Sequence, residues 1–408
     1  MTRAFVIGIV TAVLQASVAD AGALTLDEAL ARARSANSDL AVAAADIAAA
    51  RGRFAQAGVL AANPVLTTAG THHRIPGEVN ADAAVRLGQE LAVGGQRGLR
   101  IAAARHDVAH AEWLRADRER LVDGEVRRAF VGVVAAERRR ALAVDAAAQS
   151  ERLADIAGTR LAHGDTGRLD VDLARLDATK THADAAAAQI AVDAARTRLA
   201  TAIGAEPDEI LAVAAPDEPT RPTPTEDAVL ARAITARPDL TAARAERDRL
   251  EGEANLAHRV GLIPNPTIRG FYSHENGSET LVGAEIEVPL PIFDRQQGAE
   301  MELRGQAAAA AAQVTRLERD IPREIRAALA HHRAAQTVWS RYREAALPAA
   351  DQARASLTQA LSAGLVGIAD VLAQQDRLRE ARGASVDAWL DLHEAEADVI
   401  EALGEGPW

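Results

Sequence analysis

Two histidines in this chain lie one helical turn apart, a spacing that is typical of metal-binding helices. They bound the stretch His106-Asp107-Val108-Ala109-His110, and histidines four residues apart on one helix can bind zinc. Zinc proteases place a glutamate base directly after the first histidine, whereas here that residue is Asp107, and no third ligand is evident downstream. A solvated helix face is therefore the favoured interpretation, and a metal-dependent hydrolase that uses His106 and His110 is kept as an alternative.

The other histidines form no more complete set of ligands or catalytic groups. They include His72-His73, His274 and His331-His332. The sequence has no evident Ser-His-Asp order, no phosphate-binding loop and no glycine-rich dinucleotide turn. We predict that the chain is not an enzyme, holds no cofactor and uses none of these histidines as a metal ligand.

A glycine-rich motif occurs twice and predicts two turns between helices. Gly-x-x-Gly-x-x-Asp-Val spans 164–171 and again 364–371, and glycine readily adopts the left-handed backbone that ends a helix. The turn residues are Gly164, Asp165, Thr166 and Gly167 in the first copy and Gly364, Leu365, Val366 and Gly367 in the second. Asp170 and Asp370 follow just inside the next helix, where they are candidates for a charged site or, alternatively, for helix caps.

Other matches share this offset of 200 residues. Asp39-Leu40 recurs as Asp239-Leu240, and Asn63-Pro64 recurs two residues later than the same offset, as Asn265-Pro266. Such a unit is far longer than a solenoid repeat. The sequence therefore predicts two copies of one large helical hairpin, in repeats 24–214 and 225–408, joined by a linker at 215–224 that is rich in proline and acidic residues.

The composition favours helices and excludes several classes of protein. The chain of 408 residues is 48% hydrophobic but only 3% aromatic, which suits long helices packed through small side chains. Its net charge of −12 makes nucleic acid a poor partner, because such binding needs clustered lysine and arginine. There is no cysteine, which excludes disulfides and thiolate metal sites.

The first 23 residues have the layout of a secretory signal peptide. Arg3 precedes an apolar run over 4–14 and then small residues through Ala23, with cleavage expected after Ala19, Ala21 or Ala23. The run is too short to span a bilayer, and no later stretch reaches the roughly 18 apolar residues that a spanning helix needs. We expect the mature protein to be exported, and to be either soluble in the periplasm or inserted in a membrane as β-structure.

The two halves show the same order of predicted elements. These are a helix (25–60 and 225–262), two strands (65–73 with 83–91, and 267–274 with 280–288), a very long helix (96–162 and 297–363) and a return helix (169–203 and 368–403). Each long helix would span on the order of 100 Å at about 1.5 Å per residue. Pro322 and Pro348 predict a kink or break in the second of them.

The predicted strands raise a problem that one chain cannot solve. Val282, Ala284, Ile286 and Val288 alternate with Gly283, Glu285 and Glu287, which predicts a strand with one apolar and one polar face. Four strands cannot close a membrane barrel, since the smallest use about eight, and open edges are not tolerated in lipid. The predicted fold is thus mostly α with a small β part, in which long antiparallel helical hairpins would form an α-barrel. If the strands enter a membrane, several copies must contribute to one β-barrel, and three copies would give about twelve strands.

Taken in order, the motifs resemble those of the TolC-like outer-membrane factors of Gram-negative tripartite efflux systems. The motifs are Asn63-Pro64, Leu91-Ala92-Val93-Gly94-Gly95-Gln96-Arg97, Val288-Pro289-Leu290-Pro291-Ile292-Phe293 and the two glycine turns. The segment 91–97 is similar to the Leu-x-x-Gly-Gly-x-Arg opening of the long helix in the heavy-metal-efflux branch, the CzcC-like proteins. Each motif alone is weak, whereas their order, spacing and duplication over nearly the whole mature chain are specific.

The resemblance implies a homotrimer in the outer membrane, in contact with its lipid, with a helical tunnel in the periplasm and a belt around the tunnel formed partly by segments such as 205–224. The family does no chemistry and is the exit duct for substrate delivered by an inner-membrane RND-type pump through a periplasmic adaptor. The two glycine turns then match the tips that meet the adaptor, and Asp170 and Asp370 match acidic residues that line the entrance. Three copies would place a ring of negative charge there, which favours cations.

This chain departs from the family pattern at the entrance, and its function has alternatives. Some relatives carry a second acid three residues after the aspartate, where this chain has Ala373, and the arginine that latches some entrances is not evident at Leu365-Val366. Metal cations are the expected cargo. A duct for drugs or other organic solutes and a soluble periplasmic coiled-coil scaffold are the alternatives. Phe271 and Tyr272 are expected either in an interfacial aromatic girdle or as fillers between strands.

Overall fold

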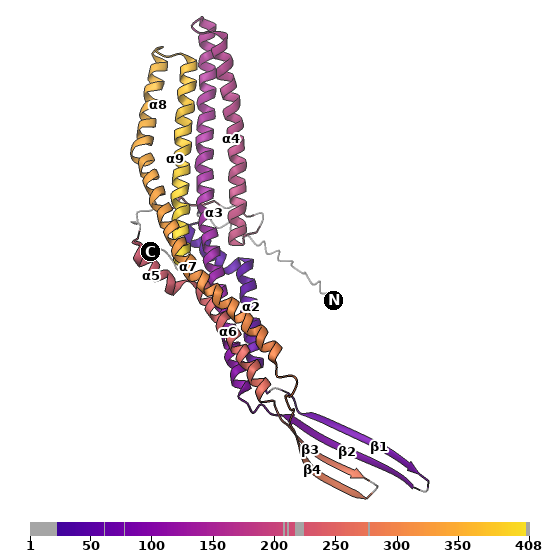
Figure 1. Cartoon of the computed structure of the whole chain (residues 1–408). Helices are drawn as coiled ribbons and strands as arrows, with labels where there is room; N and C mark the ends of the chain where they lie inside the picture. The colour runs from indigo at the N-terminus through magenta and orange to yellow at the C-terminus, as the bar shows by residue number, and fades with distance from the viewer. Residues whose placement is uncertain are drawn as a thin grey trace, which may run out of the picture.

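The molecule is long and narrow, with two helical hairpins at one end, a four-stranded sheet at the other and a shorter helical section between them (Figure 1). The structure, a computed structural model, describes residues 23–60, 62–76, 78–206, 209, 212–216, 224–275 and 278–404. The predicted signal peptide, 1–23, lies outside these residues apart from Ala23. Among the described helices, none is both long and apolar enough to cross a membrane.

Each half opens with two helices rather than with the single helix predicted. They are α1 (Leu26–Ala36) and α2 (Ser38–Ala57) in the first half, and α5 (Glu226–Ala236) and α6 (Pro238–Leu262) in the second. The breaks fall at Asn37 and Arg237, whose backbones are extended. Asn37 caps α2 by accepting a hydrogen bond from the Asp39 N–H. Pro238 is the first residue of α6, where a backbone N–H would have no partner within the helix, so proline is well tolerated there. The predicted helices over 25–60 and 225–262 are wrong at these two residues.

The long helices and return helices lie close to their predicted positions. The first hairpin consists of α3 (Gln96–His163) and α4 (Arg168–Ile203), and the second of α7 (Gln297–Arg341), α8 (Leu347–Ser362) and α9 (Ile368–Leu403). Gly164, Gly204, Gly364 and Gly404 follow the ends of α3, α4, α8 and α9 with positive φ angles. The glycine stops read from the sequence therefore gave accurate helix ends.

Only one of the two prolines interrupts the second long helix. α7 continues through Pro322, where the neighbouring Ile321 and Ile325 are fully buried, so the predicted break there is wrong, and a kink at this residue stays a prediction. Before Pro348 the chain forms a π-helical segment, η1 (Tyr342–Ala346), in which the Leu347 N–H donates to the Tyr342 carbonyl. Because proline has no N–H to donate, a widened turn accommodates it without ending the helix. The predicted interruption near Pro348 is confirmed in this form.

The largest apolar cluster lies where α1 packs against the two hairpins. Phe130 of α3, Leu199 of α4 and Trp389 of α9 are its bulkiest fully buried side chains. Many of the remaining members are alanine or valine, which lets helix backbones approach one another closely. The low aromatic content of the chain is thus concentrated at one crossing, and small side chains fill most of the bundle.

The start of the described chain pairs with the segment that follows α4. The Leu24 N–H donates to the Ala212 carbonyl at 2.8 Å, and the Ala214 N–H donates to the Leu24 carbonyl at 2.9 Å. These two bonds form a parallel bridge between Leu24 and Val213. The bridge lies inside the region predicted to contribute to a belt. The belt itself, the repeat boundaries and the linker at 215–224 stay predictions, and residues 217–223 lie outside the described part of the chain.

The four strands form one antiparallel sheet in the order β1-β2-β3-β4. They are β1 (Val65–Ile75), β2 (Glu78–Glu90), β3 (Thr267–Glu275) and β4 (Glu279–Glu287). The two halves of the chain meet in the β2–β3 pairing, where Val85 lies opposite Tyr272. All four predicted strands are confirmed, and β1 and β4 are the two edges of the sheet.

One face of the sheet is apolar and the other is polar, as the alternation predicts. Strand alternation and register put Leu66, Val85, Leu87, Ile268, Tyr272, Val282 and Ile286 on the first face, and Arg86, Arg269, Glu285 and Glu287 on the second. The apolar face is uncovered, with Val282 77% and Ile286 69% exposed. On the polar face the Arg269 guanidinium pairs with Glu285 at 3.4 Å and also with Glu287.

The two aromatic residues of β3 point to opposite faces. Phe271 lies opposite Gly283 on the polar face, and a Cβ added to that glycine would lie 2.6 Å from the phenyl ring. Phe271 therefore fills the space above a glycine in the neighbouring strand, which supports the second of its two predicted roles. Tyr272 stands exposed on the apolar face, where an interfacial girdle stays a prediction.

We predict that Gly261→Ala destabilises the junction between α6 and the loop before α7. A Cβ at this buried position would lie 1.9 Å from the Arg295 carbonyl oxygen, and a backbone atom cannot swing aside as a side chain can. Overpacking of this kind costs about 1–3 kcal/mol. Circular dichroism of the purified protein should show a lower melting temperature. Gly305→Ala is the matched control, because nothing lies within 4 Å of its added Cβ, and equal melting temperatures for the two variants would contradict the prediction.

Candidate functional site

The two predicted glycine turns lie together at the end of the molecule farthest from the sheet (Figure 1). One joins α3 to α4 and the other joins α8 to α9. The sequence predicted each turn separately, and the fold brings the two side by side. All eight turn residues, 164–167 and 364–367, therefore belong to one surface, which we call the tip surface.

The same backbone hydrogen bonds form both turns. The Asp165 N–H donates to the Arg160 carbonyl at 2.8 Å, and the Leu365 N–H donates to the Ala360 carbonyl at 2.9 Å. In each copy a glycine with positive φ, at 80° for Gly164 and 73° for Gly364, makes this geometry possible. Gly167 and Gly367 have extended backbones and precede the return helices. The predicted structural role of the leading glycines is thus clear, whereas contact with a partner is a separate question.

The two candidate aspartates have different surroundings despite their matching positions. Asp170 is half-buried and accepts a hydrogen bond from the Thr166 hydroxyl across the turn. Asp370 is exposed, and Val366 stands where the first turn has Thr166. The helix-capping alternative is wrong for both residues, because the cap positions are Gly167 and Gly367 and neither cap has a side-chain hydrogen bond. A role at an entrance stays a prediction.

A small apolar cluster holds the two hairpins together just below the tip surface. Its buried members are Leu153, Ala157, Val171, Ala174, Ile368 and Val371. Val171 and Val371 directly follow the two aspartates, so the Asp-Val pair of each motif places an acid beside the tip and an anchor beneath it. The Arg160 guanidinium adds a polar link by donating to the Leu361 carbonyl at 2.7 Å.

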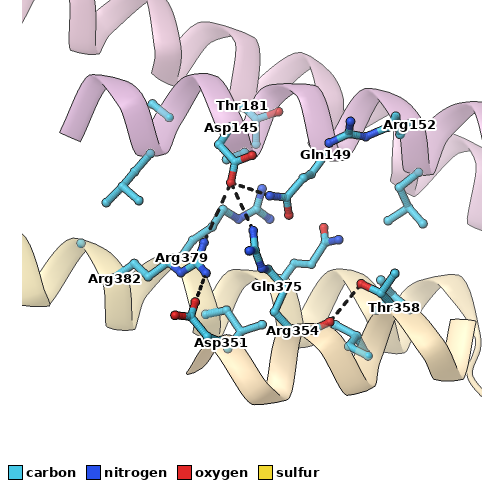
Figure 2. Close-up of a pocket in the computed structure, with 18 of the residues that line it drawn as sticks. Asp145, Gln149, Arg152, Thr181, Asp351, Arg354, Thr358, Gln375, Arg379 and Arg382 are labelled. Carbon is cyan, nitrogen blue, oxygen red and sulfur yellow. Dashed lines mark hydrogen bonds and ion pairs between the residues drawn. The ribbon is translucent and has the colours of Figure 1, made fainter. Parts of the chain in front are cut away.

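Below this cluster the two hairpins are separated by a groove of about 810 Å³. Side chains from α3 and α4 line one wall, and side chains from α8 and α9 line the other (Figure 2). The lining is rich in charge, with Arg139, Arg152, Arg354, Arg379 and Arg382 on one hand and Asp145, Asp184 and Asp351 on the other. The hairpins are thus joined here by ionic side chains more than by close apolar packing.

Asp145 is the acid through which the two walls of the groove interact. Its carboxylate lies 3.6 Å from Arg354 of α8 and 3.9 Å from Arg382 of α9 (Figure 2). Gln149 also donates to it at 2.6 Å. Because these side chains are partly exposed, each pair contributes little to stability on its own. The sequence analysis missed these residues, since nothing in their local spacing shows that α3 faces α8 and α9.

Several of the histidines that suggested metal chemistry lie beside other groups of the protein. His110 Nδ1 lies 2.9 Å from the Ala242 carbonyl, and its Nε2 lies 3.9 Å from Glu246. His331 Nε2 lies 3.0 Å from Asp391, and His274 Nδ1 lies 3.5 Å from the Thr280 hydroxyl. In the described part of the chain, no group of three or more histidine or acidic side chains is placed to hold a metal ion. A hydrolase that uses His106 and His110 therefore finds no support in the geometry.

One buried histidine has a strongly altered acidity. His393 of α9 packs against Trp389 with ring centroids 4.3 Å apart, and the Arg138 guanidinium lies 3.9 Å from the centre of the Trp389 ring. Burial, and then the charge of Arg138, lower the pKa of His393 to about 4. Burial likewise lowers the pKa of His332, helped by His331 and Arg333. Both rings are therefore neutral core side chains at physiological pH.

The motif at 91–97 has a structural role that the sequence did not reveal. The Arg97 guanidinium donates to the Gly58 carbonyl at 2.6 Å, and Arg100 donates to the carbonyls of Ala57 and Val59. Gln96 is buried and donates to the Ile263 carbonyl at 2.6 Å. These three side chains satisfy carbonyls at the ends of α2 and α6, where a helix has no partners of its own. They tie the start of α3 to the ends of α2 and α6.

Comparison with known proteins identifies the class of protein that this fold defines. The chain is 27% identical over 387 residues to the cobalt-zinc-cadmium resistance protein CzcC of Cupriavidus metallidurans, covering 94% of this chain and 91% of that protein. The outer membrane protein VceC of Vibrio cholerae superposes with a TM-score of 0.76 at 19% identity, over 93% of this chain and 96% of that one. For the CmeC outer membrane channel of Campylobacter jejuni these values are 0.78 and 15%, over 93% and 85%. No protein-family model matches the chain.

The chain thus has the fold of the outer-membrane channels, with long helical hairpins at one end and a small antiparallel sheet at the other. The predicted resemblance to TolC-like outer-membrane factors, and within them to the CzcC-like branch, is confirmed. VceC and CmeC are described as an outer membrane protein and an outer membrane channel, which agrees with the predicted location and with the prediction that the chain is not an enzyme.

We predict that His393 makes the protein less stable as the pH falls from 6.5 towards 4. Its folded-state pKa lies below the 6.5 of an ordinary histidine, so the unfolded chain binds a proton in this window that the folded chain does not. This ring therefore costs no stability above pH 6.5, and the free energy of unfolding falls as the pH is lowered from 6.5 to 4, by at most about 3.4 kcal/mol at about 1.36 kcal/mol per pH unit. Melting temperatures across this range should fall less for His393→Leu than for the wild type.

The control for this prediction is His163→Leu, at an exposed histidine near the end of α3. Its melting temperature should depend on pH as that of the wild type does. If His393→Leu kept the full pH dependence of the wild type, the assignment to this buried ring would be wrong.

Proposed function

We propose that this chain is the outer-membrane exit duct of a tripartite efflux system for metal cations. It acts as a homotrimer and receives its cargo from an inner-membrane RND-type pump through a periplasmic adaptor protein. The observation that carries the proposal is its similarity, over 94% of the chain, to a protein named for cobalt, zinc and cadmium resistance. The channel fold shared with VceC and CmeC supports the same role.

The sheet supports assembly from several copies. β1 and β4 are edge strands, and an edge presents a row of backbone N–H and C=O groups without strand partners. In lipid such groups must be satisfied within the protein. Pairing β4 of one copy with β1 of the next satisfies them, and three copies close a sheet of about twelve strands. The apolar face then meets lipid, and the polar face lines the path of the cargo.

The charges along this path suit a cationic cargo. The polar face of β4 carries Glu285 and Glu287, of which Arg269 neutralises part. At the far end Asp370 is exposed beside the tip surface, and a trimer contains three copies of it. Rings of carboxylates around a pore favour cations over anions. Weak, exposed charges also suit a duct, because tight binding would slow the release of the cargo.

The tip surface supports contact with an adaptor. Leu365 is 78% exposed at the point of the second turn. Isolated exposed leucines occur on many proteins, yet this one lies at the end of the molecule that points away from the membrane sheet (Figure 1). We assign the turn residues 164–167 and 364–367 to the adaptor contact, and Asp170 and Asp370 to the periplasmic entrance.

The proposal predicts that deletion of the gene makes cells sensitive to a few metal cations. Growth should be measured against zinc, cobalt, cadmium, nickel, copper and silver, beside a panel of organic drugs. A plasmid copy of the gene should restore growth. Sensitivity to organic compounds alone would assign the duct to drug efflux, and extraction of the protein without detergent would favour a periplasmic scaffold. Unchanged resistance to every metal in a strain without a second duct of this type would contradict the proposed cargo.

Complementation also tests the tip surface. We expect Leu365→Asp to lower metal resistance to the level of the deletion strain, because a charge replaces an apolar contact at the adaptor interface. Leu365→Met should complement fully, since it keeps an apolar side chain of similar size. Native gels should show the same amount of assembled trimer in the outer membrane for both variants. Full resistance with Leu365→Asp would mean that this turn is not part of the adaptor contact.

A further inference from the structure

Among the described residues outside strands and helices, the link between β4 and α7 stands out as an exposed apolar segment. We call residues 288–293, Val-Pro-Leu-Pro-Ile-Phe, the apolar arm. Phe293 is 90% exposed and Leu290 is 74% exposed, and Val288 and Ile292 are exposed as well. Four large apolar side chains within six residues form a patch of the kind that marks an interaction site rather than scattered surface residues.

The apolar arm continues the apolar face of the sheet. On β4 the apolar side chains stand at even positions, including Val282 and Ile286. The same alternation runs on through Val288, Leu290 and Ile292 after the strand ends. Because the arm follows β4 without a gap, whatever covers the apolar face at this end of the sheet also reaches the arm.

The backbone of the arm lacks the free N–H groups that pairing with another strand requires. Pro289 and Pro291 have no N–H to donate, and the Ile292 N–H already donates to the Leu290 carbonyl at 2.8 Å. A neighbouring copy of the chain therefore cannot extend its sheet along this segment. The arm interacts through its side chains, which suits a fluid apolar medium better than a strand edge.

The equivalent link in the first half shows that a junction of this kind need not be apolar and exposed. There Leu91 and Ala92 are half-buried, the Leu91 N–H donates to the Pro266 carbonyl at 2.9 Å, and Gln96 is buried. The first link is thus tied into the protein, whereas the apolar arm stands away from it. The difference requires an explanation beyond the joining of a strand to a helix.

The arm ends abruptly in charged residues. Asp294 and Arg295 follow Phe293 and are exposed, and the Arg295 Nε donates to the Pro291 carbonyl at 3.0 Å, which holds the guanidinium group beside the arm. Aromatic and aliphatic side chains followed by an arginine match the boundary between acyl chains and headgroups, where a cation meets lipid phosphates.

We propose that the apolar arm lies in the lipid interface on the periplasmic side of the outer membrane and anchors each copy there at the level where the sheet meets the helices. Its ligand is the phospholipid of the inner leaflet: acyl chains for Leu290 and Phe293, and phosphate for Arg295. The inference depends on the proposed function, since it requires the sheet to be in the membrane. It adds a second, helix-proximal contact with lipid that the strands do not supply.

The chain has no cysteine, so single cysteines can be introduced without other changes. We would label Leu290→Cys and Phe293→Cys with bimane in the full-length mature protein and reconstitute each variant in vesicles of phosphatidylethanolamine and phosphatidylglycerol. Both native side chains are exposed, so their removal leaves the core intact. Val282→Cys on the apolar face serves as the control in the membrane, and Leu365→Cys on the tip surface serves as the control in water. Fluorescence is quenched with iodide and with lipids that carry a nitroxide near the headgroup or deep in the chain.

If the inference is right, the labels at 290 and 293 lose most fluorescence to the shallow nitroxide and little to iodide. The label at 282 is quenched by nitroxide lipids, and the label at 365 by iodide alone. Quenching of the labels at 290 and 293 by iodide alone would overturn the inference, and so would quenching by neither agent, as expected for a contact between copies. In both cases, quenching of the label at 282 by nitroxide lipids would leave the proposed function intact. Absence of lipid quenching at 282 would overturn both.

Discussion

The apolar face of the sheet is the constraint on which the rest of this structure depends. Val282, Ile286 and their neighbours point outward, and no element in the described part of the chain covers them. Full burial of a valine, leucine or isoleucine side chain is favourable by about 1.5–3 kcal/mol, so a face of such residues is strongly unfavourable in water. An apolar environment therefore suits this face of the sheet, whereas water suits the helices with their many exposed ion pairs. The division of the molecule into two ends follows from these opposite demands.

The helical end of the molecule is long and narrow and is packed mostly through small side chains. A chain with few aromatic residues builds its bundle from alanine and valine, with Phe130 and Trp389 concentrated where α1 packs against the hairpins. Beyond that crossing, the hairpins are joined by the charged side chains around Asp145 that line the groove, and by the small apolar cluster at Val171 and Val371. Few buried contacts and many exposed polar ones mean that the tips are the part of the molecule most easily separated. A firm middle and loosely joined tips suit a duct whose free end engages another protein.

Local rules predicted the elements well, and long-range contacts account for the errors. Glycines such as Gly164 end helices through their own backbone, and the alternation of β4 shows its two faces, so these features follow from a few neighbouring residues. The break at Arg237 is different, since its buried side chain pairs with Asp239 and with Glu324, which lies 87 residues away in the sequence. The same reason hid the carbonyl contacts of Arg97 and Arg100 and the ion pairs of the groove. Pro322 was misjudged because buried Ile321 and Ile325 on either side of it hold the helix together.

The two halves match in order but differ in the details that bear on function. Thr166 binds Asp170 across the first turn, whereas Val366 packs against the apolar cluster in the second, and Asp370 stays exposed. The second hairpin also contains the π segment η1 before α8, and only the second sheet–helix link is apolar and exposed. The more exposed version of each feature lies in the second half of the chain. The first half thus has the better-tied version of each feature, and the second exposes Asp370 and the apolar arm to whatever surrounds the molecule.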